Sequence, residues 1–247
     1  MSDAFAALAP EERIITALDM GRDEALALAQ KLEGTAVWMK VGMTLYYREG
    51  PSIVRALQDR GFKVFLDLKF HDIPHQVRGA ARSAVLSGAD MLTMHTVGSA
   101  AMCQAAREGA EEAAREAGRP TPVTLGITVL TSMDQEALES VGIMRPVAEQ
   151  VKAMAAIAKE AGLSGVVASP KEAAMLRELL GPNAYIVTPG VRPAGAALGD
   201  QKRVATPAQA VLDGASHLVV GRPITQAEDP VAVFNSIVEE LKDIHLQ

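Results

Sequence analysis

The segment 65–74 reads Phe65-Leu66-Asp67-Leu68-Lys69-Phe70-His71-Asp72-Ile73-Pro74. The pattern predicts a β-strand from Val64 to Lys69, in which successive side chains point to opposite faces. The aliphatic residues at 64, 66 and 68 then share one face, which suits contact with a layer of helices. Asp67 and Lys69 share the other face with Phe65, so that a carboxylate and an ammonium point inward from the same strand.

This inward pair of charges needs a reason, because burying a charge without a partner is costly. Asp67 and Lys69 could form an internal ion pair that only satisfies itself. Asp72, however, follows three residues after Lys69, and the segment then carries more negative charge than one ion pair requires. The surplus favours a functional site over a structural ion pair.

Short apolar runs rich in β-formers alternate with amphipathic helical patterns along the whole chain. Strict alternation predicts a parallel sheet, and eight such units in 247 residues favour a (β/α)8 (TIM) barrel forming a single domain over residues 1–247. The alternative is an open Rossmann-like sheet, but no Gly-x-Gly-x-x-Gly motif follows the first strand. Residues Met1–Glu12 are expected to add a short helix before the barrel. The predicted strands are Arg13–Asp19, Val37–Gly42, Val64–Lys69, Met91–Thr96, Val123–Leu130, Gly165–Ser169, Tyr185–Pro189 and His217–Gly221.

Composition limits the class of partner. The formal net charge of −6 disfavours nucleic acid, because affinity for nucleic acid depends on neutralising phosphates. No apolar run reaches membrane-spanning length, and the first residues lack the basic and apolar regions of a signal peptide. The only cysteine, Cys103, cannot form an internal disulfide. We therefore expect a cytoplasmic protein without membrane or nucleic-acid partners.

The candidate active site follows from the strand ends, because (β/α)8 barrels place their active sites there. These ends would bring acids and lysines into one alternating cluster. Each acid has a cation within reach, so the lysines are expected to be charged. A charged lysine between carboxylates is a poor nucleophile but a good proton donor. The members of the predicted cluster are Asp19, Lys40, Asp67, Lys69 and Asp72.

The last two strands indicate a phosphate site. Many barrels of this kind bind phosphate with backbone N–H groups and a cation in the loops after strands seven and eight. Gly221 and Arg222 follow the last strand, and the loop 191–203 contains Arg192 and Gln201. This loop is either a solvent-exposed connection with incidental charges or a lid that closes on a phosphate. The histidines are dispersed and no Cys/His cluster exists, so the sequence predicts no metal site.

The complete set of strand-end motifs resembles the orotidine 5′-phosphate decarboxylase family. The resemblance spans almost the whole chain in the family's order. A wider superfamily shares the Asp-x-Lys-x-x-Asp core, whereas the complete set is highly specific. The motifs that carry the resemblance are Ala17-Leu18-Asp19, Lys40-Val41-Gly42, Asp67-Leu68-Lys69-Phe70-His71-Asp72-Ile73-Pro74, Leu130-Thr131-Ser132, Thr188-Pro189-Gly190-Val191-Arg192-Pro193, Gly199-Asp200-Gln201 and Val220-Gly221-Arg222-Pro223.

The resemblance implies a homodimer that uses no cofactor and converts orotidine 5′-phosphate to UMP and CO2, the last step of de novo pyrimidine (UMP) biosynthesis. Lys69, beside Asp67 and Lys40, is expected to protonate C6 of the pyrimidine, while Asp72 is expected to reach into the partner's site. The implied substrate-binding residues are Asp19 and Lys40 at the ribose, Thr131 by the pyrimidine, Asp67 and Ile73, and Arg192, Gln201, Gly221 and Arg222 at the phosphate.

One motif departs from the family. The family commonly continues Ile-Pro-Asn-Thr, whereas this chain has Ile73-Pro74-His75-Gln76. The usual threonine helps to contact the ribose across the dimer interface. Gln76 is longer but can still form a hydrogen bond.

Two other functions remain open. One is a Mg²⁺-dependent sugar-phosphate decarboxylase or aldolase of the same superfamily, such as 3-keto-gulonate-phosphate decarboxylase. Those relatives typically carry an acidic metal ligand on strand two, where this chain has Lys40, which would repel a cation. The other is an inert barrel that binds a nucleotide, and the intact cluster of acids and lysines argues against it.

Overall fold

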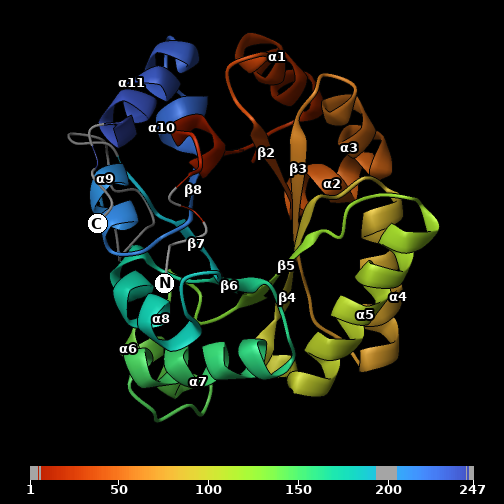
Figure 1. Cartoon of the computed structure of the whole chain (residues 1–247), viewed down its shortest axis with the longest axis vertical. Coiled ribbons are helices and arrows are strands. Elements are labelled where there is room, and N and C mark those ends of the chain that lie inside the picture. The colour runs from red at the N-terminus through yellow and green to blue at the C-terminus, as the bar shows by residue number, and fades with distance from the viewer. Residues whose placement is uncertain (1–4, 6, 193–204, 243, 245–247) are drawn as a thin grey trace.

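Eight parallel strands close into a barrel in chain order, with β8 paired to β1, in a computed structural model that describes residues 5, 7–192, 205–242 and 244 (Figure 1). This confirms the predicted (β/α)8 barrel and excludes the open sheet. Each observed strand lies within or close to its predicted range. The strands are β1 Ile14–Ala17, β2 Trp38–Gly42, β3 Lys63–Phe70, β4 Met91–His95, β5 Val123–Ile127, β6 Gly165–Val167, β7 Tyr185–Pro189 and β8 His217–Val220.

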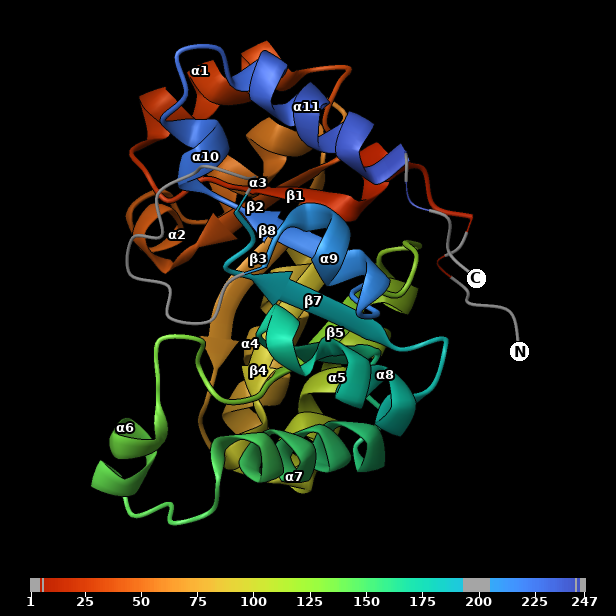
Figure 2. The same ribbon diagram turned by 90° about the vertical axis from the view of Figure 1, so that its left-hand side faces the viewer.

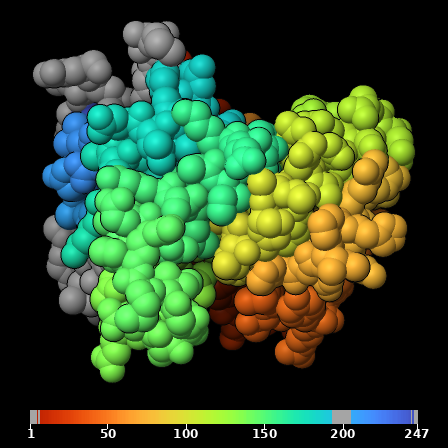
Figure 3. All heavy atoms as spheres, turned by 90° about the horizontal axis from the view of Figure 1, so that it is seen from below, coloured from red at the N-terminus to blue at the C-terminus, as the bar shows by residue number. Residues whose placement is uncertain are grey.

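Helices surround the barrel and cover the outward faces of the strands (Figures 1 and 2). Helices α5 and α7 pack side by side on the face shown in Figure 3, and Figure 2 shows α6 projecting away from the body. The helices are α1 Arg22–Leu32, α2 Met43–Glu49, α3 Pro51–Gln58, α4 Pro74–Leu86, α5 Ala100–Glu116, α6 Gln135–Ser140, α7 Val147–Glu160, α8 Ala173–Leu180, α9 Pro207–Leu212, α10 Arg222–Thr225 and α11 Pro230–Lys242.

The strands separate two apolar regions, as their period of two requires. Phe65 packs inside the barrel with residues such as Leu125 and Val187. Val64, Leu66 and Leu68 pack outside it, in the core shared with the helices. The predicted division of β3 into two faces is therefore confirmed.

The segment before β1 differs from the expected helix over residues 1–12. In its described part, residues 5 and 7–9 form no helix, and a short 3-10 helix runs over Pro10–Arg13. Phe5 instead closes the amino end of the barrel, where its ring packs edge-on against Tyr185 with 4.8 Å between the ring centroids. Arg13 anchors this segment by donating to the carbonyl oxygens of Phe5 and Ser216.

His217 lies among these rings and is almost fully buried. Its ring stacks on Tyr185 with 5.4 Å between the centroids, and its Nδ1 lies 3.1 Å from the Ser216 hydroxyl. Burial, together with the positive charges of Arg13 and Lys63, lowers the pKa of His217 to about 3. The histidine is therefore neutral in the folded protein near neutral pH.

Within the described residues, no helix is both long and apolar enough to cross a bilayer.

Candidate active site

A cavity of about 920 Å³ opens at the carboxyl ends of the strands. This is the end at which (β/α)8 barrels carry their chemistry. The cavity brings together residues from the first, second, third, fifth, seventh and eighth strand–loop units, although they lie far apart in the sequence. The sequence-predicted site residues that line it are Asp19, Lys40, Asp67, Lys69, Thr131, Arg192, Gly221 and Arg222.

Four of these residues form a row of alternating charge. The Lys40 ammonium on β2 lies 3.0 Å from Asp19 Oδ1, which follows β1, and 3.6 Å from Asp67 Oδ2 on β3. The Lys69 ammonium lies 2.9 Å from the same Asp67 Oδ2. One oxygen of Asp67 therefore faces two lysines.

Burial differs sharply along this row. The side chains of Lys40 and Asp67 are 9% and 12% exposed, whereas that of Asp19 is 63% exposed. Burial by itself raises the pKa of Asp67, but the ammoniums of Lys40 and Lys69 and the hydrogen bonds from Lys69 and Thr93 outweigh it. The net pKa of Asp67 lies below its ordinary value, so this carboxyl is ionised at neutral pH.

Gly42 makes room for the first ion pair of the row. A Cβ atom at this position would lie 2.9 Å from Asp19 Oδ1 and 3.1 Å from Lys40 Nζ. Both atoms belong to the ion pair, so a side chain at residue 42 would displace it. The Lys40-Val41-Gly42 motif thus supplies both a charge and the space that the charge occupies.

The end of β3 is irregular where it carries Lys69. Leu66 pairs with Leu92 of β4, but the next pairing joins Phe70 to Met94. Between these two pairs β3 therefore moves on by four residues while β4 moves on by two. Lys69 sits in this bulge with a φ angle of 54°, in the left-handed region that residues other than glycine rarely adopt. Its backbone N–H donates to Thr93 Oγ1 at 2.9 Å.

Thr93 is a functional candidate that the sequence reasoning missed. It is fully buried on β4, and its hydroxyl donates to Asp67 Oδ1 at 2.9 Å. A buried threonine in a strand looks like an ordinary core residue. The sequence pattern that could have indicated Thr93 is its position two residues before His95, which places it on the inward face of a strand that ends at the active site.

The residues predicted to bind phosphate follow β7 and β8. Arg192 and Arg222 line the cavity together with Gly190 and Gly221. Arg192 is buried and donates from Nη1 to the carbonyl oxygen of Val191 at 2.9 Å. Gln201, the remaining predicted phosphate ligand, lies outside the described residues.

Asp72 and Ile73 do not line the cavity of the single chain. Both are exposed, Ile73 by 62%, and Asp72 Oδ1 accepts a hydrogen bond from the backbone N–H of Ile73 at 2.6 Å. No lysine or arginine in the described part of the chain forms an ion pair with Asp72. The expected cluster of five charges is therefore a row of four within one chain, with Asp72 on the adjoining surface.

His95 borders the row. Burial, followed by the positive charges of His71 and Lys69, lowers the pKa of His95 below its ordinary value, and the rings of His71 and His95 lie 5.7 Å apart. In the described ranges, no three His, Cys, Asp or Glu side chains form a group able to hold a metal ion.

The fold and this row of charges define a (β/α)8-barrel protein whose cavity is lined by an Asp–Lys site and two arginines. The sequence profile of the Orotidine 5′-phosphate decarboxylase / HUMPS family matches residues 12–237. The chain therefore belongs to this family.

Individual relatives agree with the family assignment. Orotidine 5′-phosphate decarboxylase of Moorella thermoacetica is 52% identical over 235 residues, which cover 94% of this chain and 93% of that protein. The enzyme of the same name from Nitratidesulfovibrio vulgaris is 49% identical over 230 residues, or 92% of this chain and 97% of that protein. The crystal structure of orotidine 5′-phosphate decarboxylase from Lactobacillus acidophilus matches with a TM-score of 0.83 at 37% identity, and covers 93% of this chain and 99% of that one.

Proposed function

We propose that this chain decarboxylates orotidine 5′-phosphate to UMP and CO2 without a cofactor, as the last step of de novo UMP synthesis. The observation that carries the proposal is the row Asp19–Lys40–Asp67–Lys69, with Lys40 and Asp67 buried, at the mouth of a barrel of this family. Relatives with 52% and 49% identity carry the name of this enzyme, which supports the assignment of substrate and reaction.

The decarboxylation requires charged groups that are held in place around C6 of the substrate. When the bond between C6 and the substrate carboxylate breaks, CO2 leaves and the electron pair stays on C6 in an orbital that cannot delocalise into the ring π system. Stabilisation must therefore come from preorganised electrostatics and from a proton. Lys69 supplies both, because its ammonium faces the developing carbanion and then transfers a proton to C6. The neutral lysine regains its proton from solvent.

Asp67 holds the Lys69 ammonium at 2.9 Å. In the proposed complex, Asp67 also lies against the substrate carboxylate and is joined there by Asp72 of a second subunit. The crowding of carboxylates destabilises the bound substrate, and the loss of CO2 relieves it. Lys40 spaces the acids of the row, since its ammonium lies between Asp19 and Asp67.

The remaining contacts orient the substrate. Arg192, Arg222 and the backbone of Gly221 are proposed to bind the phosphate, with Gln201 as a further ligand from outside the described residues. Asp19 and Lys40 are proposed to bind the ribose hydroxyls, and Thr131 to lie by the pyrimidine. Because the phosphate is remote from C6, its binding energy can be used to hold the reacting ring in place.

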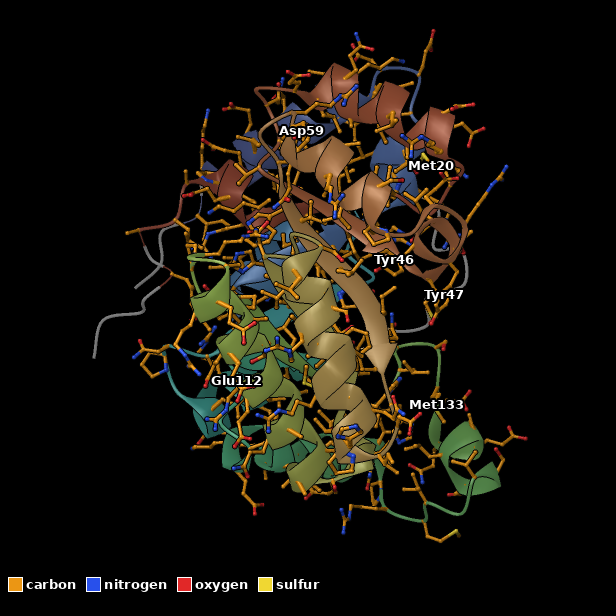
Figure 4. All side chains as sticks on the ribbon, turned by 90° about the vertical axis from the view of Figure 1, so that its right-hand side faces the viewer. Met20, Tyr46, Tyr47, Asp59, Glu112 and Met133 are labelled. Carbon is orange, nitrogen blue, oxygen red and sulfur yellow. The ribbon has the colours of Figure 1, made fainter. Side chains whose placement is uncertain are left out.

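Asp72 is proposed to act across a homodimer. It lies on the surface next to Ile73, and further exposed apolar side chains follow the neighbouring strands: Met43 and Tyr47 after β2, and Val97 after β4. In Figure 4, Tyr47 lies to the upper right of the carboxyl end of β3, which is drawn as a broad arrow. Exposed apolar groups gathered at one end of the barrel suit contact with a second copy of the chain. Ile73, and Gln76 in place of the usual threonine, would meet the partner's substrate there.

The Mg²⁺-dependent alternative is disfavoured by Lys40. Its ammonium lies 3.0 Å from Asp19 and 3.6 Å from Asp67, so a divalent cation between these acids would meet a positive charge.

Nucleic acid is not part of the proposed function, because the net charge of −6 and the acids of the site would repel a phosphate backbone. The proposal includes a cytoplasmic location.

The reaction is tested by following the absorbance change as orotidine 5′-phosphate becomes UMP, in buffer containing EDTA. We expect full turnover with the chelator present and loss of turnover in Lys69→Ala. Activity that EDTA abolishes and Mg²⁺ restores would establish the metal-dependent alternative. Folded wild-type protein without turnover would refute the enzymatic function and favour a barrel that only binds a nucleotide.

A further inference from the structure

The Thr93 hydroxyl joins the two residues on which the proposed chemistry depends. It donates a hydrogen bond to Asp67 Oδ1 at 2.9 Å and accepts one from the backbone N–H of Lys69 at 2.9 Å. A hydroxyl has one proton to donate and lone pairs to accept with, so the group is used in both directions. Thr93 itself is fully buried and does not line the cavity.

The first bond supports an unusual backbone. Lys69 has a φ angle of 54°, within the bulge where β3 advances four residues against two of β4. A side chain in this left-handed region is strained, and such strain persists only where surrounding contacts fix it. The bulge takes Lys69 out of the regular hydrogen-bond ladder between β3 and β4. The Thr93 hydroxyl instead accepts the hydrogen bond from the backbone N–H of Lys69.

The second bond decides which oxygen of Asp67 faces the lysines. Oδ1 accepts from Thr93, while Oδ2 lies 2.9 Å from Lys69 Nζ and 3.6 Å from Lys40 Nζ. The torsion that turns a carboxylate is soft and twofold, so the side chain alone does not hold this orientation. With Oδ1 fixed on one side, Oδ2 holds the Lys69 ammonium at a defined place above the strand.

We propose that Thr93 is a positioning residue for the decarboxylation, which aims the Lys69 ammonium through both the Lys69 backbone and the Asp67 carboxylate. The inference rests on the proposed function for its kinetic consequence. Thr93 does not touch the substrate, so its contribution falls on the reaction step and not on substrate binding. A displacement of about 1 Å at a reacting group costs about 100-fold in rate.

The surroundings of Asp67 also make the effect visible as a pH shift. The charged and titratable groups that face it are Lys40 from β2, Lys69 from its own strand and His95 from β4. The Thr93 hydrogen bond is one of the contacts that lower the pKa of Asp67. Removing the hydroxyl while keeping the other groups therefore raises this pKa, and the acidic limb of the rate profile moves to higher pH.

The test compares Thr93→Val, which keeps the shape and removes the hydroxyl, with Thr93→Ser, which keeps the hydroxyl. We expect kcat to fall about 10- to 100-fold in Thr93→Val with KM changed by less than about threefold, and kcat within about threefold of wild type in Thr93→Ser. Thr16→Val is the matched control, because Thr16 is also fully buried in a strand, and its hydroxyl has no hydrogen-bond partner within the described part of the chain. It should leave kcat unchanged.

A second readout needs no substrate. The Asp67 carboxyl is titrated by NMR in the free wild-type protein and in Thr93→Val, and its pKa should be higher in the variant. Thr93→Val with wild-type kcat and an unshifted Asp67 titration would overturn the proposal. Equal loss of kcat in the valine and serine variants would also overturn it. If wild-type protein shows no turnover, the proposed function fails, while the titration still tests the positioning of Asp67.

Discussion

Replacing Asp67 by asparagine should destabilise the folded protein strongly, because the row of charges depends on this one carboxylate. Asparagine keeps the shape of the side chain and an acceptor for the Thr93 hydroxyl. It removes the negative charge that lies 2.9 Å from Lys69 Nζ and 3.6 Å from Lys40 Nζ. Two ammoniums then remain at the barrel mouth, and among the described residues the exposed Asp19 is the one carboxylate left in an ion pair with Lys40.

The magnitude follows from the distances. With an effective dielectric constant of about 20, each of the two attractions amounts to about 5 kcal/mol before desolvation is counted. The desolvation of Asp67 offsets a large part of this sum, and removing one partner of a buried ion pair typically costs about 3–5 kcal/mol. Asp19→Asn breaks the 3.0 Å contact with Lys40, but Asp19 is 63% exposed, so its loss should cost about 1 kcal/mol or less.

The assay is urea unfolding of wild type, Asp67→Asn and Asp19→Asn at neutral pH, with the free energy of unfolding extrapolated to water. A loss in Asp67→Asn of less than about 1 kcal/mol, or a loss equal to that in Asp19→Asn, would refute the reasoning. The contribution of Asp67 to the free energy of unfolding should also depend on pH in a defined direction. Because the folded pKa of Asp67 lies below its ordinary value of 3.8, its contribution is present above pH 3.8 and is lost as the pH falls through the lower folded value. The difference between wild type and Asp67→Asn should therefore shrink only in strong acid.

Two further predictions concern the ends of the barrel. The pKa of His217 in the folded protein is about 3, against 6.5 ordinarily, so the unfolded chain binds a proton that the folded chain does not. As the pH falls from 6.5 to 3, this group should therefore lower the free energy of unfolding of the wild type by about 1.4 kcal/mol per pH unit. His217→Phe should abolish this part of the pH dependence, measured by urea unfolding at each pH. An unchanged pH dependence in the variant would contradict the assignment. Arg222→Ala should raise KM for orotidine 5′-phosphate about 10- to 100-fold, as expected for a lost charged hydrogen bond, but leave turnover of the nucleoside orotidine unchanged. Equal losses with both substrates would remove Arg222 from the phosphate site.

Much of the fold could be predicted because its signals are local and repeat eight times. The alternation of apolar strands and amphipathic helices fixed the order of elements, and the period of two in 64–69 placed Asp67 and Lys69 on the inner face. The short helices α2, α6 and α10 were not predicted, because pieces of four to seven residues carry too little periodic pattern. The segment before β1 was expected to form a helix, but Phe5 packs on Tyr185 at the end of the barrel.

The site was predictable where a charge stood at the end of a strand. Asp19, Lys40, Asp67 and Lys69 were found in this way, and the structure places them in one row. Long-range geometry was not predictable. The left-handed backbone of Lys69 depends on the register between β3 and β4, and the strand pattern of 64–69 continues through it without a glycine or proline. Thr93 matters only through its contacts with that bulge, which no sequence spacing reveals.

The site shared between two subunits is tested most directly by mixing two inactive variants. Lys69→Ala and Asp72→Ala should each form dimers with almost no turnover of orotidine 5′-phosphate. After unfolding and refolding together, half of the dimers are mixed, and one of the two sites in each mixed dimer contains both native residues. About one quarter of wild-type activity should therefore return. No recovery, in a mixture where subunit exchange has been confirmed, would contradict a site that Asp72 completes from the partner.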